Sequence, residues 1–183
     1  MARLPYVDPA SAPPKVQEAF AGLAAPLNIF RIVAHAEANF RPFLRYGASI
    51  LGRQQLSARL RELAILRVAT LSRARYEWTQ HVPIAKATGV TDAQIAALEA
   101  GNARADCFDA RDQRVLRFTD EVVRDVRASD ATFAEMSRHF PPREIVELIL
   151  AIGFYMAVAR LLETTAVDLE AAPGTAIVDA LQR

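Results

Sequence analysis

Three titratable side chains in the middle of the chain have types and spacings that suit proton transfer. Glu62 lies in the apolar run 60–68, and Glu77 and His81 follow it, four residues apart from each other. A spacing of four residues places two side chains on one face of a helix. A turn between two helices would bring Glu62 back toward that pair, and two carboxyl groups with an imidazole could then transfer protons near neutral pH.

The same stretch resembles the carboxymuconolactone decarboxylase family, whose fold is shared with alkyl hydroperoxidase D. Redox members of this family carry a glutamate, a Cys-x-x-Cys pair and a histidine at set spacings. Glu62 and His81 match the glutamate and the histidine, but Ala74 and Glu77 occupy the cysteine positions. Residues 77–81 are instead similar to the Glu-(aromatic)-x-x-His pattern of the decarboxylase branch. The likeness extends over roughly residues 5 to 170.

Helix signals and apolar periodicity predict an all-α protein with a single domain. We expect an extended arm at residues 1–14, a helical domain at 15–170 and a C-terminal tail at 171–183. Asn28, Ser57 and Thr91 are the expected N-caps of three helices, and Pro42 is expected to open another. Helices are predicted over about 15–23, 28–38, 42–51, 58–72, 74–88, 92–100, 109–127, 130–140 and 142–165. The resemblance implies a bundle like that of alkyl hydroperoxidase D.

Composition and charge exclude several classes of function. The net charge is +1, so no electrostatic field recruits nucleic acid or anionic lipid. Cys107 is the only cysteine, which excludes an intramolecular disulfide, a Cys-x-x-Cys redox pair and a thiolate zinc site. The N-terminus lacks the apolar core of a signal peptide, and the apolar stretch Leu148–Ala159 is too short to span a bilayer. We therefore expect a soluble cytoplasmic protein.

The chain is also expected to self-associate. Its apolar content of 52% is at the upper side for a soluble globular protein, and surplus apolar surface is often covered in an oligomer. The resemblance implies a homo-oligomer, built as a trimer, dimer or hexamer, with pockets near subunit contacts. The other expected partner is a small-molecule substrate.

Each candidate residue also has a purely structural interpretation. Glu62 could be an acid at the helix edge that pairs with Arg61 or Arg67. Glu77 and His81 could form an exposed pair that stabilises the helix by only about 0.3–0.5 kcal/mol; their register with Glu62 in the family pattern favours a site. Tyr76 could be a core or interface aromatic or could donate a hydrogen bond to a developing enolate of the substrate, and Tyr155 could pack in the core or line the substrate pocket.

The leading hypothesis is a cofactor-independent acid–base lyase that acts on a small carboxylated or carbonyl compound. The model reaction is decarboxylation of a carboxymuconolactone-type acid, with His81 as proton donor or relay, oriented by Glu77, and Glu62 behind them. Arg73 and Arg75 are either solvated charges of a turn or a fork for the substrate carboxylate. We expect no metal and no cofactor, because no metal-binding motif or phosphate-binding loop is present.

Two other classes of function are alternative hypotheses. The first is a thiol peroxidase of the alkyl hydroperoxidase type, which would have to use Cys107 because both thiols of the redox pattern are missing. The second is a non-catalytic oligomeric binding protein, in which Glu62, Glu77 and His81 form a buried structural network.

Overall fold

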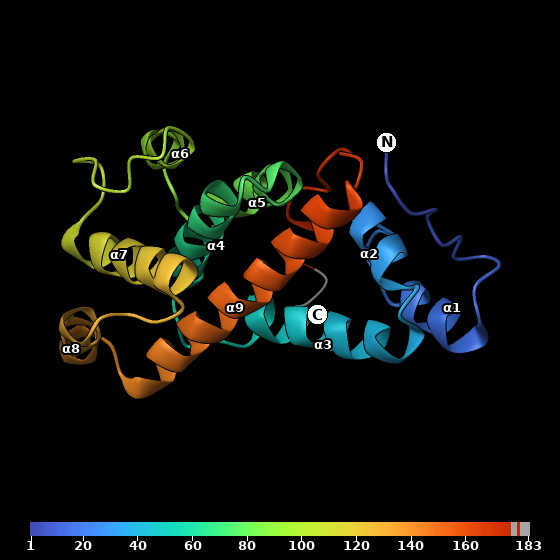
Figure 1. Ribbon diagram of the computed structural model, residues 1–183, viewed down its shortest axis with the longest axis horizontal. Coiled ribbons are helices and arrows are strands. Elements are labelled where there is room, and N and C mark those ends of the chain that lie inside the picture. The colour runs from blue at the N-terminus through green and yellow to red at the C-terminus, as the bar shows by residue number, and fades with distance from the viewer. Residues whose placement is uncertain (177–178, 180–183) are drawn as a thin grey trace.

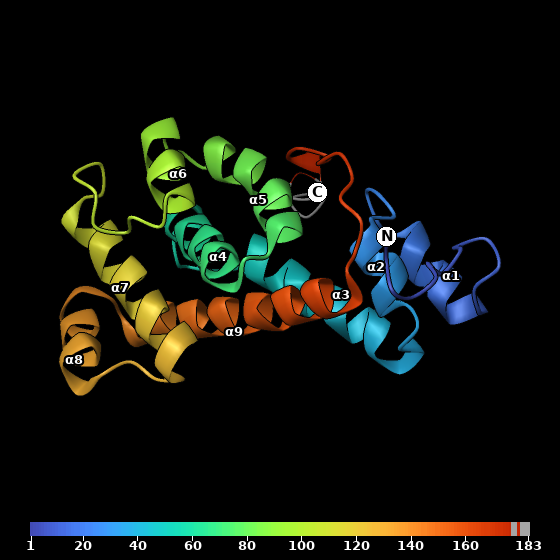
Figure 2. The same ribbon diagram turned by 45° about the horizontal axis from the view of Figure 1, so that its top comes forward.

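The computed structural model describes residues 1–176 and 179. Within this part of the chain the regular structure is helical, without a β-strand, which confirms the predicted all-α class. In the two ribbon views, α1 and α2 lie at one end of the molecule and α7 and α8 at the other, with α9 running between them (Figures 1 and 2). The helices are α1 (Pro14–Ala21), α2 (Asn28–Val33), α3 (Glu37–Gly52), α4 (Ala58–Ser72), α5 (Arg75–Ala87), α6 (Asp92–Glu99), α7 (Ala110–Asp125), α8 (Asp130–His139) and α9 (Pro142–Thr165).

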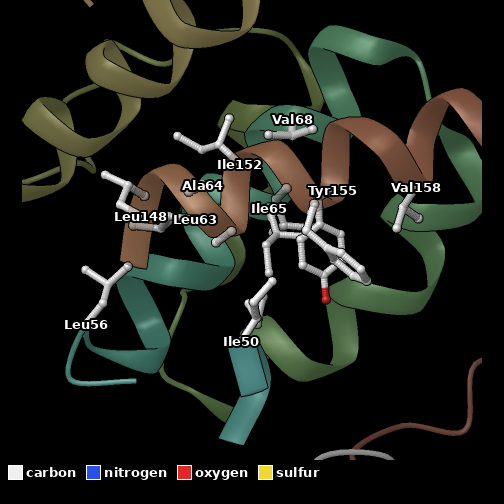
Figure 3. Close-up of a cluster of buried hydrophobic side chains, with 14 of the residues drawn as sticks. Ile50, Leu56, Leu63, Ala64, Ile65, Val68, Leu148, Ile152, Tyr155 and Val158 are labelled. Carbon is white, nitrogen blue, oxygen red and sulfur yellow. The ribbon is translucent and has the colours of Figure 1, made fainter. Parts of the chain in front are cut away.

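The helix α4 is enclosed on all sides. Every residue from Leu60 to Ala69 is buried, including two arginines and one glutamate. A helix that is buried all round must be covered by several neighbours, and α4 contacts α5, α6, α7 and α9. Figure 3 shows its aliphatic side chains beside Leu148, Ile152 and Val158 of α9. Glu62 is therefore carried by a rigid core helix.

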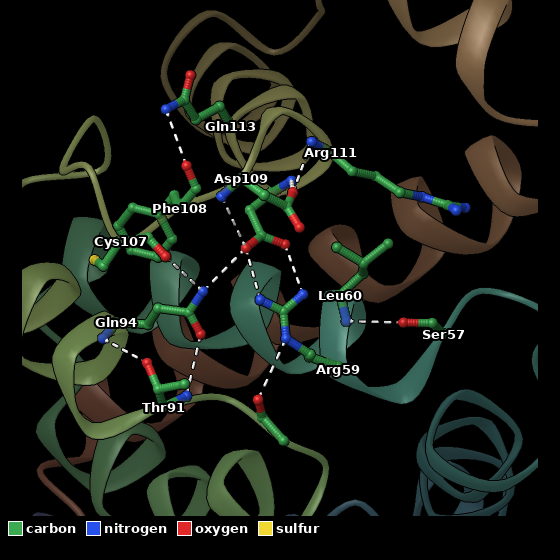
Figure 4. Close-up of polar contacts among 12 residues, drawn as sticks. Ser57, Arg59, Leu60, Thr91, Gln94, Cys107, Phe108, Asp109, Arg111 and Gln113 are labelled. Atoms are coloured by element: carbon green, nitrogen blue, oxygen red, sulfur yellow. Dashed lines mark hydrogen bonds and ion pairs between the residues drawn. The ribbon is translucent and has the colours of Figure 1, made fainter.

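Side-chain caps fix the start of several helices, as predicted for two of them. Ser57 caps α4 by accepting a hydrogen bond from a backbone N–H, and Thr91 forms a capping box with Gln94 at the start of α6. Arg59 of α4 holds both carboxylate oxygens of Asp112 at 2.6 and 2.7 Å, and Gln94 donates to the same carboxylate at 3.0 Å (Figure 4). These contacts tie α4, α6 and α7 together at one end of the bundle.

Two predicted helix boundaries near the N-terminus are wrong. The helix predicted over 28–38 ends at Val33, and the next helix begins at Glu37, five residues before Pro42. Pro42 lies inside α3 because a proline in a 16-residue helix removes only one backbone hydrogen bond. The burial of Phe40, which is 1% exposed, favours continuing the helix across the proline.

The N-terminal arm and the segment after α9 hold each other in place. The hydroxyl of Tyr6 donates to Asp168 at 3.1 Å, and the backbone N–H of Asn28 donates to the Glu170 carboxylate at 2.6 Å. Asn28 is thus the first residue of α2 and not its cap, because its side chain donates to the Asp168 carbonyl instead. Of the predicted tail, residues 177–178 and 180–183 lie outside the described residues.

Among the described residues, α9 is the one helix long and apolar enough to cross a membrane by length and composition. Its best 18-residue window has a mean hydropathy of 2.1, so the apolar stretch is longer than Leu148–Ala159. However, 56% of that window is buried inside the protein, and a core helix passes the same test. The packing of α9 against α4 accounts for its apolar composition.

Candidate active site

A connection of two residues brings Glu62 and His81 together. The helix α4 ends at Ser72, and Arg73 adopts a left-handed φ of 55° that reverses the chain into α5. Glu62 Oε2 then lies 2.8 Å from His81 Nδ1, although the residues are 19 positions apart. Glu62 is 0% exposed, and Glu77 and His81 are 2% and 7% exposed. The three side chains therefore share one buried region between α4 and α5.

The role predicted for Glu77 is wrong, because Glu62 and not Glu77 binds the imidazole. Both carboxyl oxygens of Glu77 are buried without a hydrogen-bond partner, so Glu77 does not orient His81. A spacing of four residues brings two side chains to one helix face. It does not decide which acceptor the ring binds, and the packing of α5 against α4 places Glu62 at the ring nitrogen.

Arg61 completes this arrangement, and the sequence suggested it only as a structural partner of Glu62. Its Nε donates to Glu62 Oε1 at 3.2 Å, and its Nη1 donates to the Ile50 carbonyl at 3.3 Å. Each carboxylate oxygen of Glu62 therefore has a partner, as a buried charge requires. The signal available in the sequence was an arginine next to a glutamate inside an apolar helix. Arg67, the other suggested partner, pairs with Asp120 instead.

Glu77 has the environment of a neutral carboxylic acid. Burial raises its pKa well above the usual value, and the negative charges of Glu163 and Glu62 raise it further. A carboxyl group that is buried and not hydrogen-bonded favours its protonated form. Glu77 is therefore a potential proton donor, whereas Glu62 is a hydrogen-bond acceptor.

Tyr155 of α9 contributes a second neutral donor. Its ring stands edge-on to the imidazole of His81, with centroids 4.7 Å apart and an interplanar angle of 86°. Burial raises the pKa of Tyr155 well above its usual value, as does the charge of Glu62, while Arg61 lowers it. The phenol therefore stays protonated. Figure 3 shows Tyr155 at the α4–α9 contact.

These groups line a cavity of about 160 Å³. Its polar lining side chains are Tyr76, Glu77, Gln80, His81 and Tyr155. The rest of its lining consists of aliphatic and aromatic side chains, two glycines and a proline, contributed mainly by α2, α3 and α9. No lysine or arginine of the described residues lines it.

Tyr76 and Gln80 hold the segment after α9 at one wall of the cavity through Glu170. The Tyr76 hydroxyl donates to the Glu170 carboxylate, and Gln80 Nε2 donates to the Glu170 carbonyl at 3.3 Å. Burial, followed by the hydrogen bond to Glu170, raises the pKa of Tyr76. This hydroxyl is therefore already engaged, while the segment that it holds brings Pro173 and Gly174 to the cavity wall.

Two predicted substrate-binding residues lie elsewhere. Arg73 and Arg75 are exposed and line a separate hollow with Thr70, Trp78 and other residues. The predicted fork for a substrate carboxylate is therefore absent from the cavity. The turn that reverses the chain places both arginines at its outer side, where their charges are hydrated.

Cys107 is also remote from the cavity. It is exposed, its Sγ lies 3.7 Å from the Ala93 carbonyl oxygen, and it is not among the cavity-lining residues. Within the described part of the chain, no group of three or more histidine, cysteine, aspartate or glutamate side chains is arranged to hold a metal ion.

Comparison with known proteins gives one family match and several structural matches. The model of the carboxymuconolactone decarboxylase family matches residues 37–121. No curated protein matches the chain in sequence. Among solved structures, a peroxidase-related protein of Ralstonia eutropha JMP134 with an alkylhydroperoxidase AhpD core has a TM-score of 0.79 at 19% identity, over 92% of both chains.

Two further structures share the fold. A peroxidase-related protein of Silicibacter sp. TM1040 has a TM-score of 0.78 at 21% identity, over 93% of this chain and 92% of its own. The debrominase Bmp8 has a TM-score of 0.75 at 16% identity, over 96% of both chains. Identities this low show the fold and carry no activity across.

The family match covers the segment that holds Glu62, Glu77 and His81, and the structural likeness extends over nearly the whole chain. The protein therefore has the alkyl hydroperoxidase D-like fold, and residues 37–121 match the carboxymuconolactone decarboxylase family.

Proposed function

We propose that the protein is a cofactor-independent enzyme that moves protons on a small carbonyl compound, in a decarboxylation or a related enolisation. The observation that carries this proposal is the presence of two different proton-transfer groups beside one cavity. His81 is bound through Nδ1 to the buried Glu62, and Glu77 is a buried carboxyl group without a partner.

The bond to Glu62 prepares His81 to act as a base. A carboxylate at Nδ1 fixes the orientation of the ring and keeps the proton on that nitrogen, which leaves the lone pair of Nε2 free. The same carboxylate stabilises the imidazolium that forms when Nε2 takes up a proton. Because His81 lines the cavity, a bound substrate is the group that it would deprotonate.

The proposed reaction runs through an enol. Nε2 of His81 removes a proton from the carbon next to a carbonyl group, and the electrons of the broken C–H bond form a C=C bond. The carbonyl oxygen takes the proton of Glu77, while the Tyr155 hydroxyl donates a hydrogen bond to it. One such donor commonly lowers a barrier by about 3 kcal/mol. Return of the proton from His81 to carbon, and of the enol proton to Glu77, completes a turnover.

Decarboxylation uses the same groups. Loss of carbon dioxide from a β-keto acid or a related acid leaves the electron pair of the broken C–C bond on an enolate. Glu77 protonates the enolate oxygen. An imidazolium at His81 then delivers a proton to the carbon while the enol proton returns to Glu77, which leaves the ketone and a neutral imidazole. Both reactions therefore depend on His81, and they differ in the bond that supplies the electron pair.

The test compares wild type with His81→Ala in two assays. One measures carbon dioxide release from a carboxymuconolactone-type acid, and the other measures deuterium uptake from D₂O next to the carbonyl of small cyclic ketones. We expect the His81→Ala rate to fall by a factor of about 100 or more. His139→Ala is the control, because His139 pairs with Glu135 on the surface. Equal rates in wild type and His81→Ala contradict the assignment.

A peroxidase is the second candidate considered, and Cys107 is its only possible thiol. Cys107 is exposed and lies outside the cavity, and the sequence has no second cysteine that could act as a resolving thiol. A peroxide-consumption assay on Cys107→Ser decides this point. A loss of consumption in that variant would assign the activity to the thiol.

We also propose that the protein acts in the cytoplasm as a homo-oligomer. Val146, Ile149 and Leu150 of α9 are exposed and apolar, and an isolated chain would leave them in water. Light scattering coupled to size-exclusion chromatography would distinguish a dimer, trimer or hexamer. A monomer over the whole concentration range would contradict the proposal.

A further inference from the structure

The cavity has one polar side and one apolar side. The lining side chains from α2 and α3, such as Phe30, Phe43 and Leu51, are all apolar. The polar lining groups come from α5 and α9. A ligand that fills the cavity must therefore be mostly apolar, with its polar atoms confined to one edge.

The polar side carries no cation that could balance a negatively charged ligand. Arg61 is buried on α4, where it is bound to Glu62 and to a backbone carbonyl, and it is not among the lining residues. Glu62 lies directly behind the imidazole of His81 and would repel an anion. An unpaired carboxylate in such surroundings loses its hydration without compensation.

The polar groups that face the cavity suit an uncharged ligand with a carbonyl or hydroxyl oxygen. Glu77 and Tyr155 are hydrogen-bond donors, because burial keeps both protonated. The two Glu77 oxygens have no partner, and a buried polar group without a partner is unfavourable. A carbonyl or hydroxyl oxygen of a ligand would satisfy this donor, whereas a hydrocarbon would leave it unpaired.

The size of the cavity sets the size of the ligand. Its volume is about 160 Å³, and an apolar cavity of about 150 Å³ is large enough to hold benzene. Gly47 of α3 also shows that the wall is tight, because a Cβ added there would lie 3.2 Å from Phe154.

We infer that the cavity selects an uncharged compound about the size of one six-membered ring, with a carbonyl or hydroxyl oxygen facing Glu77, Tyr155 and His81. This inference rests on the enolisation branch of the proposed function, because the substrate of the decarboxylation branch is itself an anion. Binding itself can be measured without any turnover.

The test uses three probes that share one ring: cyclohexanone, cyclohexanecarboxylate and cyclohexylammonium. Their affinities for the full-length chain at neutral pH are compared by calorimetry or by ligand-observed NMR. We expect the ketone to bind at least about tenfold more tightly than either ion, because each ion loses hydration in the cavity. Equal or tighter binding of the carboxylate or the ammonium ion would overturn the inference, as would no binding of the ketone.

A variant that fills the cavity locates the binding site. Ala48→Leu adds three carbon atoms to a lining position of α3 and should weaken ketone binding by at least about tenfold. Ala157→Leu is the matched control, because Ala157 is exposed on α9 and is not among the lining residues. Unchanged ketone affinity in a folded Ala48→Leu variant would place the ligand elsewhere and refute the inference. The comparison of the three probes on wild type does not depend on how this variant folds.

Failure of the inference and failure of the proposed function give different results. Tight ketone binding without deuterium exchange or carbon dioxide release supports the neutral-ligand cavity and contradicts the enzyme. Turnover of a carboxylated acid without ketone binding supports the enzyme and overturns the neutral-ligand cavity.

Discussion

Breaking the buried Arg61–Glu62 pair with one substitution is expected to destabilise the protein more than removing both charges. Glu62→Gln keeps the size of the side chain and can still accept a hydrogen bond from His81. It leaves the guanidinium of Arg61, which is 3% exposed, without a carboxylate. Nη2 of Arg61 already has no hydrogen-bond partner, and Nη1 contacts only the neutral Ile50 carbonyl, which does not balance the charge as Glu62 does.

The magnitude follows from the burial of both partners. Removing one member of a buried ion pair typically costs about 3–5 kcal/mol, whereas replacing both members by side chains of similar volume is often nearly neutral. Glu62→Gln and Arg61→Met should therefore each lower the free energy of unfolding by about 3–5 kcal/mol. The double variant should lose clearly less than the sum, which gives a coupling of about 2 kcal/mol or more.

Urea unfolding followed by far-UV circular dichroism measures all four corners of this cycle. The control cycle uses the exposed pair Arg41–Glu18, whose side chains are 45% and 72% exposed and whose coupling should be about 0–1 kcal/mol. Additivity of Glu62→Gln and Arg61→Met within about 0.5 kcal/mol would refute the reasoning, because it would mean that the two side chains do not stabilise each other in the core.

Three further predictions concern titration, backbone conformation and the core. Because burial raises the pKa of Glu77 above its ordinary 4.5, the unfolded chain releases this proton first as the pH rises. The free energy of unfolding then decreases from about pH 4.5 up to the folded-state pKa, by up to about 1.4 kcal/mol per pH unit. Urea unfolding of Glu77→Gln over the same pH range should lack this decrease. A decline of the same size in Glu77→Gln would show that another group causes it. Val126 ends α7 with a left-handed φ of 68° and is 87% exposed, so Val126→Gly should raise the free energy of unfolding by about 1 kcal/mol; a lower thermal midpoint would contradict the assigned strain. Leu63, which is 0% exposed, should lose about 2–5 kcal/mol on truncation to Ala, whereas Leu169→Ala, at 51% exposure, should stay within about 0.5 kcal/mol. Similar unfolding midpoints for these two variants would contradict the enclosed position of α4.

Local features of the sequence were enough to predict where most helices begin and end. Ser57 and Thr91 cap their helices as predicted, because the hydrogen bonds of an N-cap form within one turn of the chain. The prediction failed at Pro42, where the local rule favours a helix start. The burial of Phe40 in the same helix outweighed it. Boundaries fail where tertiary packing opposes a local preference.

The sequence by itself determined which residue types this site can use. The single cysteine excludes a dithiol centre. Glu62, Glu77 and His81 stand at the positions of the family pattern that has no cysteine pair. Spacing also placed Glu77 and His81 on one helix face, and both line the cavity.

Only the tertiary structure decided how these groups are connected. Packing of α5 against α4 places His81 Nδ1 2.8 Å from Glu62 Oε2. The burial of Glu77 without a hydrogen-bond partner raises its pKa and favours the neutral acid. The tertiary structure also places Arg73 in a separate surface hollow, although Arg73 lies next to the motif in sequence. Hydrogen-bond partners and proton affinities depend on distances and burial that neighbouring helices set, and spacing along one helix does not contain that information.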